Sequence, residues 1–177
     1  MLKAFFLIIL ITAVFSGCAG KAPPDVKRPL PSLEHKNEVD PETRQRVEHI
    51  LRRVKRASES RSLENLGRTT MNEAVVLMDL GNDISSIIIK ALKQNGNWKY
   101  RFWLVDILGF VGGTGNIIPL VEVIEDTSEH LEVRLRACES LKELRLPSAI
   151  PHLLIARELV NESAVKEAIQ KAIDFLR

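Results

Sequence analysis

The sequence has little cysteine, few aromatic residues and almost no net charge. Only Cys18 and Cys138 occur among its 177 residues, so it has neither a disulfide framework nor a zinc-type cysteine spacing. The formal net charge of +2 argues against a dedicated nucleic-acid binder, because such proteins rely on many basic side chains. Aromatic residues make up 5 % and hydrophobic residues 45 %. The apolar residues are mostly Leu, Ile, Val and Ala, which favours a core of packed helices.

The longest apolar run is also short. Ala4 to Phe15 has twelve residues, broken only by Thr12, whereas a helix needs roughly 20 residues to span a bilayer. The run follows Lys3 and precedes small residues, as in a signal peptide. Phe15-Ser16-Gly17-Cys18 resembles the lipobox of bacterial lipoproteins, although Leu is usual where Phe15 stands. We therefore expect a signal peptide over 1–17 and a lipid on Cys18. A signal cleaved near Ala19 and an uncleaved anchor are the alternatives.

The lipoprotein resemblance implies an address in the cell envelope. Two or more acyl chains, such as palmitate, hold a protein firmly on a membrane, whereas one chain holds it only marginally. Ala19, and not Asp, follows the cysteine. In Gram-negative lipoproteins, this implies transport to the outer membrane, with the protein facing the periplasm. Residues 18–40 would form a tether, because the prolines Pro23, Pro24, Pro29 and Pro31 lie there among polar residues.

Residues 41–69 are expected to form a basic amphipathic helix and a polar connection. Asp40 and Pro41 make a favourable helix start. An apolar stripe follows at helical spacing: Val47, Ile50, Leu51 and Val54. Arginines cover much of the remaining surface, including Arg52, Arg53 and Arg56. Either the stripe packs on the rest of the protein and the charges are solvated, or the arginines bind anionic lipid headgroups or an acidic partner.

Residues 70–177 repeat at intervals of 32 and 33 residues, and this periodicity predicts the fold. Ile118-Pro119 recurs as Ile150-Pro151, and Tyr100-Arg101 recurs as Val133-Arg134 and then as Val165-Lys166. We expect seven helices in stacked antiparallel pairs without a β-sheet, because one pair cannot bury its apolar stripe alone. The first helix should start at a capping box, Thr70 to Glu73. The helix from Trp98 should end at Gly109. Leucines and isoleucines at equivalent positions should be buried: Leu108, Leu141, Ile169 and Ile173.

This pattern resembles the HEAT-repeat family, particularly the short repeats of phycobilisome lyases. Leu108-Gly109-Phe110-Val111-Gly112 and Ile117-Ile118-Pro119-Leu120 match the family best, and the resemblance covers about residues 70–177. It implies an all-α fold, a short α-α superhelix (HEAT/armadillo-like solenoid) of about three helix pairs plus a closing helix. It also implies that Arg101 and Arg134 form ion pairs between repeats, often to an Asp such as Asp126. Binding of an anionic ligand by these arginines is the alternative.

No catalytic or metal-binding pattern emerges from the sequence. The loop from Gly109 to Gly115 lacks the Gly-Lys-Ser/Thr of a phosphate loop, so it is interpreted as a turn between helices. The four histidines are scattered, and no Gly-x-Ser-x-Gly elbow occurs. Cys138 lies in a predicted helix without a nearby histidine and is interpreted as a packing residue. We therefore expect no enzymatic activity, no cofactor and no metal.

The HEAT resemblance implies binding of another protein on the second helices of the pairs. The polar candidates there are Glu122, Glu125 and His152, and Phe102 is a candidate contact on an aromatic helix otherwise attributed to packing. The prediction is a membrane-anchored, non-enzymatic scaffold for an unidentified envelope protein, with no role for nucleic acid and an open oligomeric state. A lyase-like enzyme or chaperone is an alternative, although pigment attachment is cytoplasmic. A lipid- or cell-wall-binding module is another.

Overall fold

The first helix begins where the sequence places it. The computed structural model describes residues 39–60 and 63–177. The predicted signal peptide, Cys18 and nearly all of the predicted tether lie outside these residues. Oδ1 of Asp40 accepts a hydrogen bond from the backbone N–H of Thr43 at 2.9 Å, and the helix starts at Pro41. The Thr43 hydrogen bonds also lower the pKa of Asp40. Asp40 is therefore an N-cap, as expected.

The described residues form eight α-helices and no strand. The helices are α1 (Pro41–Ser60), α2 (Leu63–Met78), α3 (Ser85–Gln94), α4 (Trp98–Val111), α5 (Ile117–Glu125), α6 (Leu131–Leu144), α7 (Ile150–Leu159) and α8 (Ser163–Leu176). Short 3₁₀ turns precede α3, α5 and α7. Pro119 and Pro151 lie in the first turns of α5 and α7, where a missing N–H leaves no intrahelical hydrogen bond unmade.

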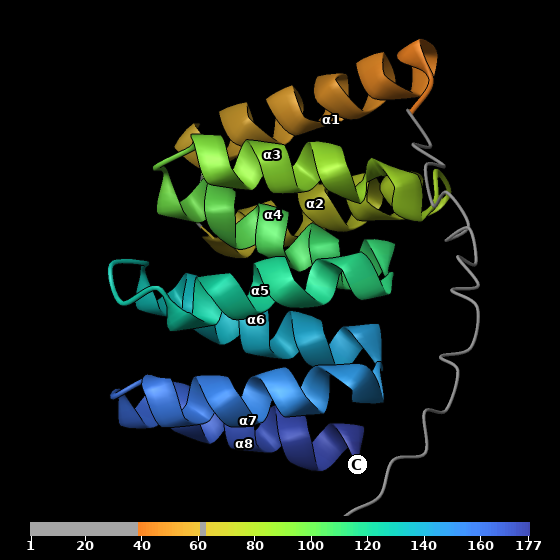
Figure 1. Cartoon of the computed structure of the whole chain (residues 1–177). Coiled ribbons are helices and arrows are strands. Elements are labelled where there is room, and N and C mark those ends of the chain that lie inside the picture. The colour runs from red at the N-terminus through yellow and green to blue at the C-terminus, as the bar shows by residue number, and fades with distance from the viewer. Residues whose placement is uncertain (1–38, 61–62) are drawn as a thin grey trace, which may run out of the picture. The chain divides into compact units, whose positions relative to one another are not determined.

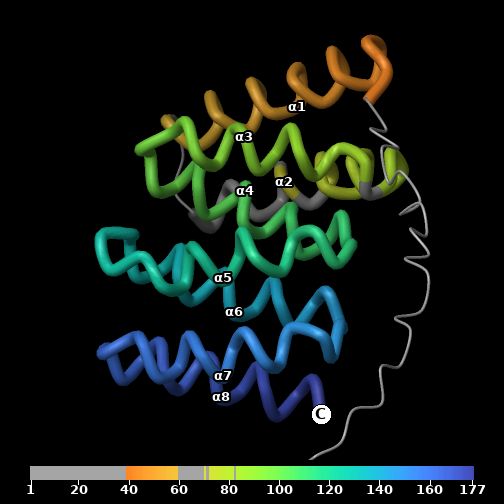
Figure 2. Tube along the Cα trace, in the orientation of Figure 1, coloured from red at the N-terminus to blue at the C-terminus, as the bar shows by residue number. Residues whose placement is uncertain are grey.

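The helices stack in two layers (Figure 1). One layer holds the first helix of each pair, α2, α4 and α6, together with α8. The other layer holds the second helices, α3, α5 and α7. Helix α1 packs on α2, α3 and α4 at one end of the stack, and α8 lies at the other end (Figure 2). All described residues belong to one unit, Lys36–Arg177. The expected HEAT-like α-α superhelix and its seven repeat helices are confirmed.

Equivalent repeat positions supply the core. Leu108, Leu141 and Ile173 are fully buried at one such position, and Leu104, Ala137 and Ile169 at another. The apolar stripe of α1 is also buried: Val47, Ile50, Leu51 and Val54. The stack and α1 therefore share a continuous core, as one-dimensional repeat packing requires.

The expected helix start at Thr70 is wrong. Helix α2 begins at Leu63, and Thr70 is a buried residue in its interior. Much of the polar connection expected at the end of 41–69 is accordingly helical. Glu73 does not reach back to an N-cap; its buried carboxylate forms an ion pair with Arg53 of α1, with Nη2 and Oε1 2.9 Å apart. Glu73 fits a capping box by residue type and position, but it joins α2 to α1 instead.

The expected helix end at Gly109 is also wrong. Helix α4 continues to Val111 and stops before Gly112, whose φ of 83° lies in the left-handed region that suits glycine. Gly109 is buried at the contact with α6. A Cβ added to Gly109 would lie 2.9 Å from both Cα and Cβ of Ser140. The glycine is needed for close helix packing, and not for ending the helix.

Candidate interaction surface

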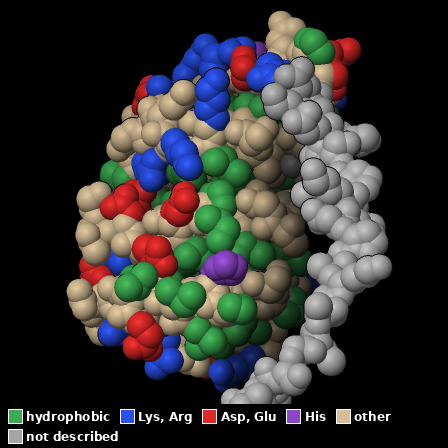
Figure 3. Space-filling view, in the orientation of Figure 1, with side chains coloured by type: hydrophobic (Ala, Val, Ile, Leu, Met, Phe, Trp, Pro, Cys, Tyr) green, Lys and Arg blue, Asp and Glu red, His purple; other side chains and the backbone are tan. Residues whose placement is uncertain are grey.

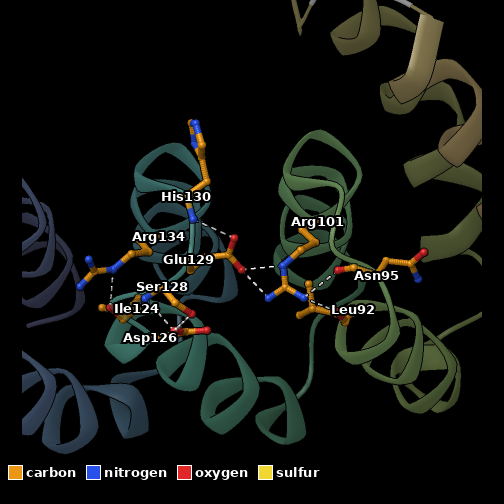
Figure 4. A network of polar contacts seen from close by, with 9 residues as sticks. All are labelled: Leu92, Asn95, Arg101, Ile124, Asp126, Ser128, Glu129, His130 and Arg134. Atoms are coloured by element: carbon orange, nitrogen blue, oxygen red, sulfur yellow. Dashed lines mark hydrogen bonds and ion pairs between the residues drawn. The ribbon is translucent and has the colours of Figure 1, made fainter.

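Arg101 of α4 links the end of α3 to the loop that precedes α6, at the seam between repeats. Its Nε donates to Oε2 of Glu129 at 2.6 Å, and its guanidinium also donates to the carbonyls of Leu92 and Asn95 at the end of α3 (Figure 4). The last carbonyls of a helix have no intrahelical partner. Arg101 therefore caps α3, the second helix of one pair, and also binds Glu129 in the loop before α6.

Arg134 repeats this arrangement one repeat later. Its side chain is only 2 % exposed. Nε donates to the carbonyl of Ile124 near the end of α5 at 2.9 Å, and the two terminal nitrogens reach the Glu162 carboxylate at 2.8 and 3.3 Å. These hydrogen bonds lower the pKa of Glu162. The two arginines thus form a repeated structural seam.

The expected partner of these arginines, Asp126, is replaced by two glutamates. Oδ1 of Asp126 accepts hydrogen bonds from the backbone N–H and the hydroxyl of Ser128, at 2.9 and 2.6 Å, and these bonds lower its pKa. Its carboxylate therefore stabilises a local turn (Figure 4). Glu129 and Glu162 each lie 28 residues after their arginine. That equal interval was the sequence signal that could have identified them.

The outward positions of the second helices differ from repeat to repeat. Lys90 of α3, Glu122 of α5 and Leu154 of α7 occupy equivalent positions, 32 residues apart, and all three are exposed. Lys93 and Glu122 form an ion pair at 3.5 Å between largely exposed side chains. Exposed pairs of this kind contribute little stability. Of the other polar candidates here, Glu125 and His152 are only partly exposed.

The candidate Phe102 lies on a different surface. It is half-buried, and its ring makes an edge-to-face contact with Trp103, with ring centroids 5.3 Å apart. With Leu135 of α6 and Ala168 of α8, it lines a groove of about 380 Å³ on the first-helix layer. Glu139 and Lys171 on the groove already form ion pairs with Lys142 and Glu167. Phe102 therefore does not join the candidates on α5 and α7 in one site.

The candidate arginines of α1 have different surroundings. Arg53 forms the ion pair with buried Glu73 described above, so it joins α1 to α2. Arg52 is exposed, 3.8 Å from Glu48, and lines a groove of about 250 Å³ between α1 and α3. Lys55 and Lys90 also line this groove. Arg56 is exposed. The basic helix thus combines a packing arginine with exposed cations, which the sequence pattern did not separate.

Reactive and metal-binding groups are not assembled in the described residues. In 39–60 and 63–177, no three His, Cys, Asp or Glu side chains are placed to hold a metal ion. Cys138 is fully buried, and burial raises the pKa of its thiol to about 12. The thiol therefore stays protonated at neutral pH. None of the described helices has the length and apolar character needed to cross a membrane.

Known proteins that are similar to this chain support the HEAT-repeat fold. A family model described as HEAT repeats matches residues 85–174, just over half of the chain. The structure of human deoxyhypusine hydroxylase in complex with glycerol is similar, with a TM-score of 0.56 and 23 % sequence identity. The match covers 75 % of this chain and 44 % of that one, so this chain spans less than half of that protein. The likeness at this identity concerns the fold alone. No curated protein sequence matches the chain.

Proposed function

The chain belongs to the HEAT-repeat family, and on this basis we propose that it is a membrane-anchored, non-enzymatic scaffold that binds another envelope protein. The binding face is the exposed side of α3, α5 and α7. Stacked helix repeats expose an extended surface along one layer, which suits contact with a protein better than enclosure of a small molecule. The candidates Glu122, Glu125 and His152 belong to this face.

The observation that carries the proposal is a contrast between the seam and the face. At the seam, Arg101 and Arg134 each bind a carbonyl of the preceding second helix and a glutamate 28 residues further on. On the face, the equivalent residues are basic, acidic and apolar: Lys90, Glu122 and Leu154. Figure 3 shows basic side chains over α1 and α3 and apolar ones over α5 and α7. Stack stability does not dictate these exposed side chains, so they are available for recognition.

The lipid anchor is the second part of the proposal. It is supported by the lipobox resemblance of Phe15 to Cys18, with placement in the envelope, and in the outer membrane facing the periplasm if the cell is Gram-negative. A proline-rich tether of about 20 residues would reach roughly 60 Å at about 3.1 Å per residue. Cys18→Ala should remove the lipid mass and release the protein from membrane fractions, since acylation at Cys18 would be lost. Retention of both properties would contradict the anchor.

Site-specific photo-crosslinking in cells tests the binding face. A photoreactive residue in place of Lys90 or of Glu122 should capture the same envelope protein, because both positions are exposed on the second-helix layer. The same residue in place of Asp174, exposed on α8, is the matched control and should not capture it. Products that are absent, or identical at all three positions, would contradict the proposed face.

A further inference from the structure

The groove between α1 and α3 has basic side chains on both of its walls. Arg52 and Lys55 of α1 and Lys90 of α3 line it, and all three are exposed. Glu48 is the one acidic residue among the described residues that line it. Figure 3 shows the basic side chains gathered over α1 and α3. The four charged residues thus leave the groove with an excess of positive charge.

The three cations are not neutralised by one another's neighbours. Lys55 and Lys90 form no ion pair or side-chain hydrogen bond with any residue of 39–60 and 63–177. Arg52 lies 3.8 Å from Glu48, but the two side chains are 56 % and 48 % exposed. An exposed pair at this distance is weak and easily exchanged for a stronger one. All three cations are therefore available to an anionic group that enters the groove.

The other acidic residues near the groove are paired or lie outside its lining. Glu73 and Glu122 already pair with Arg53 and Lys93, at 2.9 and 3.5 Å. Helix α3 itself contains no acidic residue. Glu59 follows Lys55 by one turn of α1, does not line the groove and forms no ion pair with a described residue. The positive charge of the groove is thus not cancelled from the elements around it.

Tyr100 supplies an independent sign of a ligand. It lines the groove and is only 3 % exposed, yet its hydroxyl forms no hydrogen bond within the described part of the chain. A buried tyrosine hydroxyl normally has a partner. Burial raises the pKa of this hydroxyl to about 12, so at neutral pH it keeps its proton and can donate. The groove therefore combines three cations with one unpartnered donor, which together suit an anionic acceptor.

The size and position of the groove favour a protein segment as its occupant. Its volume of about 250 Å³ lies below the range of about 300–1,000 Å³ that is typical of small-molecule pockets. Glu48 and Lys55 are about 10 Å apart along α1, at about 1.5 Å per residue, and about three residues of extended chain cover that length. Lys90 also belongs to the proposed protein-binding face. A flat membrane surface would meet the outermost charges, and not nearly buried Tyr100.

We propose that the groove between α1 and α3 binds an acidic segment of the partner protein. Its carboxylates would pair with Arg52, Lys55 and Lys90, and one carboxylate or carbonyl oxygen would accept a hydrogen bond from Tyr100. Charge-assisted hydrogen bonds of this kind are stronger than neutral ones, and charge complementarity supplies the specificity. The inference rests on the proposed scaffold function and specifies the chemistry of the partner.

Twin synthetic peptides test this inference. Both are about six residues long, enough to cross the groove in extended form, and both carry one central leucine; the other positions are glutamate in one and glutamine in the other. In fluorescence anisotropy with the full chain, the glutamate peptide should bind at least about tenfold more tightly, and less tightly as salt rises. Absence of binding, or equal binding of the twins, would overturn the proposal.

A pair of charge variants locates the binding. Lys55→Gln should weaken binding of the glutamate peptide about fivefold or more, because one charged contact is lost. Arg46→Gln removes the same charge from an exposed position of α1 that does not line the groove. This matched control should bind like the wild type. Equal losses in the two variants would show attraction by the net charge of the helix alone and would refute the assigned groove.

Tyr100→Phe separates a binding role from a structural one. Removal of the hydroxyl should weaken binding of the glutamate peptide about threefold or more, the usual effect of losing one hydrogen bond. The midpoint of urea unfolding should not fall, because the hydroxyl has no described partner in the free protein. Unchanged peptide binding, or a loss of stability without a loss of binding, would contradict the role assigned to Tyr100.

Vesicles distinguish an anionic lipid from an acidic segment. Vesicles that contain phosphatidylglycerol should displace the glutamate peptide no better than vesicles of phosphatidylcholine. Stronger displacement by phosphatidylglycerol that Lys55→Gln abolishes would show that lipid headgroups occupy the groove and would overturn the proposal. Glu122 does not line the groove. Photo-capture there without peptide binding would therefore refute only this inference, whereas failed capture at both Lys90 and Glu122 would refute the proposed function itself.

Discussion

Gly109 allows α4 and α6 to approach more closely than two helices with ordinary side chains could. Gly109→Ala would bring a Cβ within 2.9 Å of the Cα of Ser140, and backbone atoms cannot move aside as a flexible side-chain end can. The helices would have to separate in a packed core. We expect a loss of about 1–3 kcal/mol in the free energy of unfolding, the usual range for overpacking. Urea denaturation measures this loss.

Gly115→Ala is the control for this substitution. Gly115 lies in the 3₁₀ turn before α5, and no atom lies within 4 Å of a Cβ placed there. Its unfolding midpoint should stay close to that of the wild type. Equal stability of Gly109→Ala and Gly115→Ala would show that the α4–α6 contact accommodates a methyl group and that the packing argument is incorrect.

Single residues also mark where the sequence could not specify local geometry. After α6, Arg145 adopts a left-handed conformation with φ 52°, at the end of a helix where glycine is usual. The sequence lacks the Leu-Gly-x-x-Gly motif after Leu144, so it contains no marker of this conformation. Leu146, the next residue, is partly buried against the core, and such packing is not local information.

At the scale of elements, α4 and α6 enclose a charged cluster. A terminal nitrogen of Arg136 pairs with Asp106 and lies 3.1 Å from Oε1 of Glu143. Burial raises the pKa of Asp106 above its usual 3.8, and Arg136 only partly opposes this effect. Burial likewise raises the pKa of Glu143, with Arg136 lowering it and Asp106 raising it further. The ionised carboxylates are thus less favoured in the folded protein than in the unfolded chain.

The raised pKa of Asp106 predicts that the free energy of unfolding depends on pH. With a raised folded pKa, Asp106 contributes stability at pH values below about 3.8 and loses it as pH rises through its folded pKa. Asp106→Asn imitates the protonated acid. Relative to the wild type, the variant should therefore gain unfolding free energy as pH rises from 3 to 7. Urea denaturation at each pH measures the difference. Asp174→Asn, at an exposed site on α8, should show no such rise, and a falling Asp106→Asn difference would contradict the assignment.

The elements themselves were largely predictable, and their boundaries less so. Apolar spacing and the repeat offset identified all seven repeat helices, because burial of one stripe per helix governs both. The start of α2 was missed because Thr70 to Glu73 fits a capping box by residue type, whereas Glu73 pairs with Arg53 of α1. The end of α4 was missed because Gly109 and Gly112 are equally good helix stops by residue type. Only the approach of Ser140 distinguishes them.

The candidate surface was predictable only in part. The repeat pattern places Glu122, Glu125 and His152 on second helices, and they do lie on α5 and α7. Phe102, the candidate contact on the aromatic helix, belongs to the other layer. The exposure of Ile155 on α7 was not predictable either, because Ile155 matches buried Val123 by repeat position. Its exposure depends on which helices are present beside it, and periodicity alone does not give that information.

At the scale of the whole molecule, each helix contacts only near neighbours in the stack. The free energy of local opening should therefore vary along the stack, and opening at the ends should cost less than opening at the centre. Leu108 of α4 and Ile173 of α8 are both fully buried at equivalent repeat positions. They offer chemically similar truncations at the middle and at the end of the same core.

Leu108→Ala and Ile173→Ala should each remove about 2–5 kcal/mol from the local packing, the usual range for a large buried aliphatic side chain. The two truncations should differ in how far along the stack they loosen the structure. Helix α4 packs on α1, α2, α3 and α6, whereas α8 packs on α6 and α7. Hydrogen exchange with mass spectrometry should therefore show faster exchange across the stack in Leu108→Ala. In Ile173→Ala it should be faster mainly in α7 and α8, with α2 to α4 still protected. An identical, uniform increase in both variants would show that the stack opens only as one cooperative unit.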